Sequence, residues 1–161
     1  MQHSKNRILK FNIFFIKILF LFFVYTYVNA DSNTIQDGGT ETDQQTLDGD
    51  GEFLTVKNNS TLATGATTKA ANIDEADNVT ITVESGSTIS ANTVAVYGDR
   101  SSGMTVTNSG TIKASGTTAI DSKGTTNATI TNNSGGTISS NRNTIRVSKT
   151  TGVGAANTTG M

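Results

Sequence analysis

The side chains of this chain that could take part in catalysis or metal binding are mainly carboxylates, and two short clusters contain several of them. The run Asp48-Gly-Asp-Gly-Glu52 places oxygen donors at alternate positions, as at the start of a calcium loop. It lacks a third donor in register and a glutamate at position twelve, so it does not match an EF-hand. We therefore interpret this run as part of a flexible acidic segment and predict no metal site.

The second cluster is Asp74, Glu75 and Asp77. Grouped carboxylates of this kind could serve as a general acid and base or as a cation site. No aromatic or basic residue lies nearby in sequence to form a pocket, so a solvated corner is the simpler interpretation. Cysteine is absent, and the only histidine is His3 near the N-terminus. This composition argues against triad catalysis and zinc binding. We predict a protein that is not an enzyme, with no catalytic, cofactor-binding or metal-binding residues and no cofactor.

Two further groups of polar residues have a functional and a structural interpretation. A basic stripe for a polyanion such as a surface glycan would consist of Lys113, Lys123, Arg142, Arg146 and Lys149. Solvated side chains that protect exposed strands explain these residues as well. Asn-x-Ser/Thr triplets, which are glycan acceptors in eukaryotic secreted proteins, begin at Asn58, Asn59, Asn78, Asn127, Asn132 and Asn157. In a sequence rich in Asn and Thr, chance accounts for most of them.

The N-terminal segment has the composition of a secretory signal. Its first ten residues hold three basic residues and no acidic one, and an uninterrupted apolar run follows at 18–28. Eleven residues are too few to span a bilayer, which takes about 20. Ala30 offers a small-residue cleavage site, so we predict a helical signal peptide at 1–30 and a mature chain from Asp31. An uncleaved membrane anchor is the alternative.

The composition after residue 30 is unusual for a globular domain. Eight basic and thirteen acidic residues remain, and this net negative charge argues against nucleic acid as a partner. Phe53 and Tyr97 are the only aromatic residues in this part, too few for an ordinary core. Cysteine is absent, so no disulfide framework replaces a core. Either disorder or a solenoid with a thin core of small residues remains.

Internal repeats favour the solenoid. Aliphatic residues that follow threonine recur at intervals of 27, 23 and 26 residues, at Leu62, Ile89, Ile112 and Ile138. The repeated segments are LTVKNNSTL at 54–62, ITVESGSTI at 81–89, TVTNSGTI at 105–112 and TITNNSGGTI at 129–138. Alternation with a period of two predicts strands, and the Asn, Ser and Gly residues between them predict turns.

These repeats predict coils of about 25 residues with three short strands each, which bury their inward faces by stacking. The fold class is all-β, a parallel β-helix of about three to four coils. The expected regions are a signal peptide at 1–30, an acidic flexible lead-in at 31–52, solenoid repeats at 53–150 and a flexible tail at 151–161. The expected inward residues are Val56, Leu62, Ile81, Val83, Ile89, Val94, Val96, Val106, Ile112, Ile120, Ile130, Ile138, Ile145 and Val147.

Behind a signal peptide, the units at 105–112 and 129–138 resemble passenger repeats of bacterial autotransporter proteins. The resemblance covers roughly residues 54–147. It implies a right-handed parallel β-helix, shown at the cell surface or released, often with a role in adhesion or biofilms. It also implies a transmembrane barrel as translocator, but the chain after Val147 shows no alternating barrel strands. A translocator is therefore expected only in a full-length relative.

We accordingly expect an exported, extracellular or outer-membrane-associated segment with a structural or adhesive role. Expected partners are a surface glycan or another host or cell-surface molecule, and a second copy at the solenoid edges. One alternative is a disordered secreted coat segment, which circular dichroism separates from the solenoid. Another is an exported polysaccharide-active β-helix protein, which an activity assay on acidic polysaccharides distinguishes.

Overall fold

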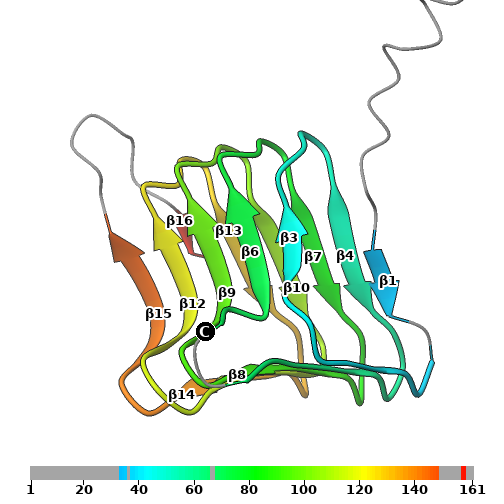
Figure 1. The fold of residues 1–161 in the computed structure, drawn as a ribbon. Helices are drawn as coiled ribbons and strands as arrows, with labels where there is room; N and C mark the ends of the chain where they lie inside the picture. Colours follow the sequence, from blue (N-terminus) through cyan, green and yellow to red (C-terminus); the bar gives the residue numbers. More distant parts are fainter. Residues whose placement is uncertain (1–32, 36, 66–67, 149–156, 159–161) are drawn as a thin grey trace, which may run out of the picture.

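A computed structural model describes residues 33–35, 37–65, 68–148 and 157–158. Over these residues the chain is an all-β parallel solenoid of five turns, and every turn adds one strand to each of three sheets. Figure 1 shows two sheets upright and the third, which contains β8 and β14, along the lower side. The expected parallel β-helix is confirmed. The predicted signal-peptide helix at 1–30 lies outside the described residues.

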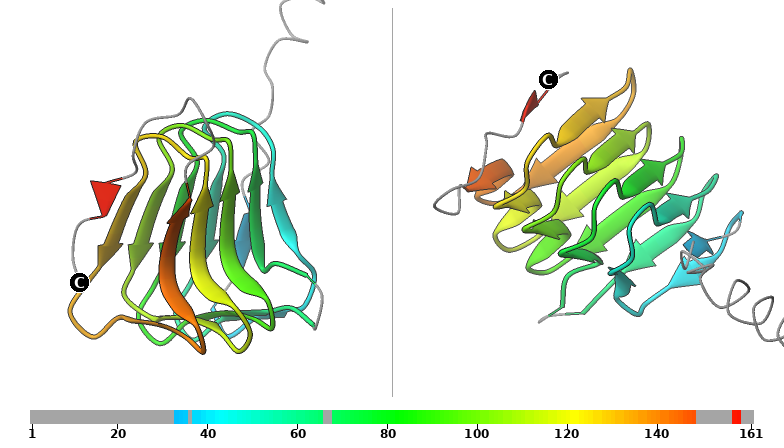
Figure 2. Two further views of the ribbon diagram at one scale, coloured as in Figure 1. Left: turned by 90° about the vertical axis from the view of Figure 1, so that its left-hand side faces the viewer. Right: turned by 90° about the horizontal axis from the view of Figure 1, so that it is seen from above.

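Each sheet collects the equivalent strand of successive coils, as Figure 2 shows from two further directions. Sheet A consists of β1 (Asn33–Ile35), β4 (Phe53–Val56), β7 (Thr80–Val83), β10 (Thr105–Asn108), β13 (Thr129–Asn132) and β16 (Asn157–Thr158). Sheet B consists of β2 (Thr40–Glu41), β5 (Thr61–Ala63), β8 (Thr88–Ala91), β11 (Thr111–Ala114) and β14 (Thr137–Ser140). Sheet C consists of β3 (Gln45–Leu47), β6 (Ala71–Asp74), β9 (Val94–Asp99), β12 (Thr118–Lys123) and β15 (Asn143–Ser148).

The core forms because aliphatic residues alternate with polar ones in the strands of the repeats. In sheet A, Leu54, Ile81 and Val106 lie in register and are fully buried. Sheet B has the equivalent row Leu62, Ile89 and Ile112. One coil exposes such a row on both sides, whereas stacking removes it from water and pairs the backbone of each strand with the next coil.

The expected number of coils, three to four, is too low. The segment 31–52 was expected to be a flexible lead-in, but its described residues, 33–35 and 37–52, contribute β1, β2 and β3 and form a further turn. Ile35 and Leu47 are buried in this turn. Its strands have only two or three residues, and its two aliphatic side chains pack against the core of the next coil. The segment is therefore too short in strands and too poor in aliphatic residues to show the repeat in its sequence.

The predicted inward residues are buried from Val56 to Ile130. At the last complete turn the prediction is only partly right, because Ile138 and Ile145 are partly buried and Val147 is 44% exposed. The strands β14 and β15 have a described neighbour on one side alone. Residues that sequence analysis did not place in the core are also buried, including Leu54, Ile73, Val79 and Met104.

Left-handed backbone positions recur at the same corner of successive coils. Gly51, Asn78, Gly103 and Asn127 have φ values of 76°, 58°, 75° and 53°. Glycine and asparagine tolerate this conformation better than other residues. The corners are therefore encoded locally in each repeat.

One turn departs from the others and uses a buried asparagine to compensate. Two residues separate β10 from β11, whereas four separate β7 from β8. Asn108 is fully buried; its side-chain amide donates to Asn132 Oδ1 (2.8 Å) and Thr137 O (3.1 Å), and its Oδ1 accepts from Gly110 N (3.2 Å). Its side chain thus satisfies backbone groups around the shorter turn.

Candidate functional site: a polar groove along sheet B

The carboxylates singled out in the sequence occupy structural positions at the coil corners. The Oδ1 atom of Asp50 accepts a hydrogen bond from Asp77 N (2.8 Å), and Asp77 Oδ1 accepts from Ser102 N (2.8 Å). Glu75 forms an ion pair with Arg100 of the next coil. These contacts link successive coils. Among the described residues, no group of three or more His, Cys, Asp or Glu side chains is arranged to hold a metal ion.

The proposed basic stripe is not continuous in the structure. Lys113 lies on sheet B, whereas Lys123 and Arg146 lie on sheet C. Lys123 Nζ lies 3.9 Å from Asp99 Oδ1, and Arg146 Nε donates to Asp121 Oδ1 at 3.0 Å. Lys149 lies outside the described residues. The charges on sheet C are thus largely compensated within the protein.

A row of interacting charged and aromatic side chains crosses sheet C. The ammonium group of Lys69 lies 3.5 Å from the centre of the Tyr97 ring and donates to Asn72 Oδ1 at 2.9 Å. Desolvation lowers the pKa of Lys69 from 10.5, although the nearby carboxylates of Asp99 and Asp74 raise it. At the end of this row the hydrogen bond to Asp121 raises the pKa of Arg146. These contacts join neighbouring strands of the sheet.

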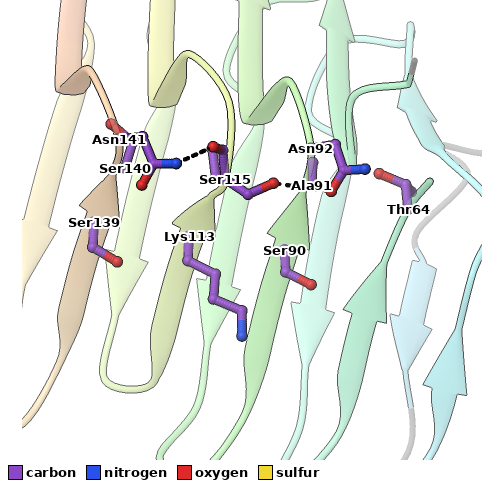
Figure 3. Close-up of a pocket in the computed structure, with 10 residues that line it drawn as sticks. Thr64, Ser90, Ala91, Asn92, Lys113, Ser115, Ser139, Ser140 and Asn141 are labelled. Carbon is purple, nitrogen blue, oxygen red and sulfur yellow. Dashed lines mark hydrogen bonds between the residues drawn. The ribbon is translucent and has the colours of Figure 1, made fainter. Parts of the chain in front are cut away.

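A groove with a volume of about 400 Å³ runs along the C-terminal ends of the sheet B strands β8, β11 and β14. Equivalent residues of three successive coils line it, as Figure 3 shows. One set, in register on β8, β11 and β14, is Ser90, Lys113 and Ser139. A second set, just after these strands, is Asn92, Ser115 and Asn141.

The second set forms a hydrogen-bonded ladder along the groove. Ser115 Oγ donates to Asn92 Oδ1 at 2.9 Å, and the Asn141 amide donates to the main-chain oxygen of Ser115. Both asparagine side chains are therefore held in place by the neighbouring coil. Lys113 is exposed, and no carboxylate of the described residues forms an ion pair with it. The groove thus offers hydroxyl and amide groups at a regular spacing, with one uncompensated positive charge in their middle.

Sequence analysis identified only Lys113 of this groove. A signal was present in the sequence, because the segments at 88–92, 111–115 and 137–141 all begin with Thr-Ile. The three residues that follow are Ser, Ala or Asn in each segment, except for Lys113. The pattern gives the positions of the side chains on each strand. That they line one groove becomes visible only when the coils are stacked.

Comparison of the chain with protein-family models, with curated proteins and with solved structures gives no significant match. The described residues contain no helix with the length and hydrophobicity that a membrane-spanning segment needs. The assignment of a function therefore depends on the geometry of the site and on the sequence.

Proposed function

We propose that this protein is an exported β-solenoid with a structural or adhesive role outside the cell, and that it binds a surface polysaccharide in the groove along sheet B. The observation that carries the proposal is the recurrence of polar groove residues once per coil. Adjacent coils repeat at about 4.8 Å. A polymer of sugars offers hydroxyl groups at regular intervals, so several weak contacts add up along the chain.

The charge on Lys113 favours a polysaccharide with carboxylate or sulfate groups. The described lining combines serine, threonine and asparagine side chains with this one ammonium group. It contains no carboxylate or histidine that would act as a general base. We therefore propose binding without catalysis, and cleavage of an acidic polysaccharide by the purified protein would contradict this part of the proposal.

The test compares two tryptophan variants in the same coil. Ser139 is exposed in the groove, and Ser134 is exposed in the turn between β13 and β14. Ser139→Trp is expected to abolish binding to an acidic polysaccharide such as alginate, measured by affinity electrophoresis, and Ser134→Trp is expected to leave it unchanged. Absence of binding by the unmodified protein to a panel of acidic and neutral polysaccharides would overturn the proposed function.

Export is the second part of the proposal and has its own test. We infer it from the basic start, short apolar run and Ala30 of the N-terminal segment, and the resemblance to autotransporter passengers fits a surface location. Intact mass measurement of protein recovered from the medium or the cell surface should show a chain that begins at Asp31. Recovery of only the full-length chain in the membrane fraction would instead support an uncleaved anchor.

A further inference from the structure

The outward face of sheet A carries a two-dimensional array of threonines. One row, in register along β1, β4, β7, β10 and β13, is Thr34, Thr55, Thr82, Thr107 and Thr131. A second row along β7, β10 and β13 is Thr80, Thr105 and Thr129. These eight residues are called the threonine face below. The pattern is the motif Thr-x-Thr on three consecutive coils.

The geometry of the sheet fixes the spacing of this array. Neighbouring strands lie about 4.8 Å apart, and two residues along a strand span about 6.7 Å. Threonine is β-branched, so its χ1 angle has few accessible values and the methyl and hydroxyl groups repeat with little freedom. A parallel ladder in strict register therefore presents a nearly regular grid of hydroxyl and methyl groups.

The hydroxyl groups of the threonine face are available for an external partner. Threonine side chains that donate hydrogen bonds to protein carbonyls, such as those of Thr93 and Thr117, lie near the turns between sheets B and C. Within the described residues, none of the eight face hydroxyls has a protein partner. All eight side chains are partly or fully exposed. Water is thus their ordinary partner.

The three outward faces differ in chemistry. Sheet C carries charged side chains such as Asp99 and Lys123 on its outward face. On sheet B, Lys113 interrupts the outward row that contains Ser90. On β7, β10 and β13 the outward positions of sheet A hold threonine alone. A charged group orders its own hydration shell and would disturb any lattice of water on the surface. The threonine face lacks such groups over three coils.

We propose that the threonine face binds ice. The array repeats in two directions with spacings similar to those of oxygen atoms on a face of hexagonal ice. Its hydroxyl groups hold water at these positions, and the methyl groups between them leave the water to bond to its own neighbours. This surface is separate from the groove along sheet B, so the proposal does not depend on the proposed polysaccharide binding.

Thermal hysteresis of ice crystals in a solution of the purified protein tests the proposal. The unmodified protein is expected to shape ice crystals and to open a measurable gap between melting and freezing. Thr107→Lys, at the centre of the face, is expected to reduce the gap about tenfold, as changes at the centre of a binding surface often do. Thr111→Lys is the matched control, because Thr111 lies in the same coil on sheet B with threonine neighbours on both sides.

A second pair of variants, Thr131→Lys on the face and Thr137→Lys off it, repeats the test if Thr107→Lys does not fold by circular dichroism. Absence of ice shaping and hysteresis by the folded, unmodified protein would overturn the proposal. An equal loss in the face and control variants would overturn it as well. A dimer that dissociates in Thr107→Lys, without ice activity, would assign the face to a second copy of the chain instead.

Discussion

Asp121 and Arg146 show how single residues join one coil to the next. The carboxylate of Asp121 is fully buried, and Arg146 in the next strand of sheet C forms two hydrogen bonds to it. A buried carboxylate without its partner is costly, because its charge then lacks the hydrogen bonds that the partner provides. Half of the Arg146 side chain is exposed, which weakens the effect through solvent screening.

Arg146→Met is therefore expected to lower the free energy of unfolding by about 2 kcal/mol, less than for a fully enclosed pair. Urea denaturation measures the change. Adding Asp121→Asn should recover part of the loss, because the charge is then removed. Arg142→Met, at an exposed position of the same coil, is the control; a loss as large as for Arg146→Met would contradict the argument.

Lys69 provides a pH-dependent prediction with a definite sign. Desolvation lowers the pKa of Lys69 in the folded protein below 10.5, its value in the unfolded chain. Between the folded-state pKa and the unfolded-state pKa, the unfolded state binds more protons. Stability contributed by Lys69 should therefore rise as pH increases through this window. The slope of unfolding free energy against pH should be smaller in Lys69→Met than in the unmodified protein. Identical slopes, or a pKa of Lys69 above 10.5 by NMR titration, would contradict the prediction.

At the scale of single elements, close approach of neighbouring coils determines where glycine is required. A Cβ atom on Gly116 would overlap the main-chain oxygen of Asn92 in the preceding coil, and backbone cannot move aside easily. Around Gly65 no atom lies within 4 Å of such a Cβ atom. The turn between β11 and β12 thus depends on glycine for steric reasons.

Gly116→Ala is expected to cost about 2 kcal/mol of stability, in the range of other overpacked sites. Gly65→Ala, the matched control, should change stability by less than about 0.5 kcal/mol. Thermal unfolding followed by circular dichroism compares the two. Equal melting temperatures would show that the coils separate more easily than the structure indicates.

At the scale of the whole molecule, the last described coil leaves backbone groups and apolar side chains exposed at the edge of the solenoid. Among the described strands, β14 and β15 each have a neighbour on one side only, and Val147 is 44% exposed. Exposed parallel edges of this kind pair with other chains. The proposed second copy at the edges would use this surface.

Sedimentation velocity at several concentrations is therefore expected to show reversible association of the purified protein. Val147→Lys should weaken it, because a charged side chain at an edge opposes pairing. Thr144→Lys, at another exposed position of β15, tests whether charge anywhere on this strand has the same effect. A compact monomer at all concentrations would contradict the prediction.

The sequence alone determined the period of the coils, the strands and most of the core. Alternation of side chains along a strand is a local property, so Ile81, Val106 and Ile130 could be placed inward without knowledge of their neighbours. Turn residues such as Gly86 and Gly135 act through their own backbone conformation, and the sequence predicted turns at both positions. The first coil was missed because Ile35 and Leu47 become core residues only when the next coil covers them.

Only the tertiary structure decided which polar residues meet. Lys113 and Ser139 are 26 residues apart in sequence but lie in register on adjacent strands, and residues with this separation become neighbours only by stacking. The same step turned Asp77 into a hydrogen-bond acceptor for the next coil, divided the basic residues between two sheets, and aligned the threonines into one face. The repeat specifies each side chain's position within a coil, whereas the register between coils creates the groove and the threonine face for which we propose binding.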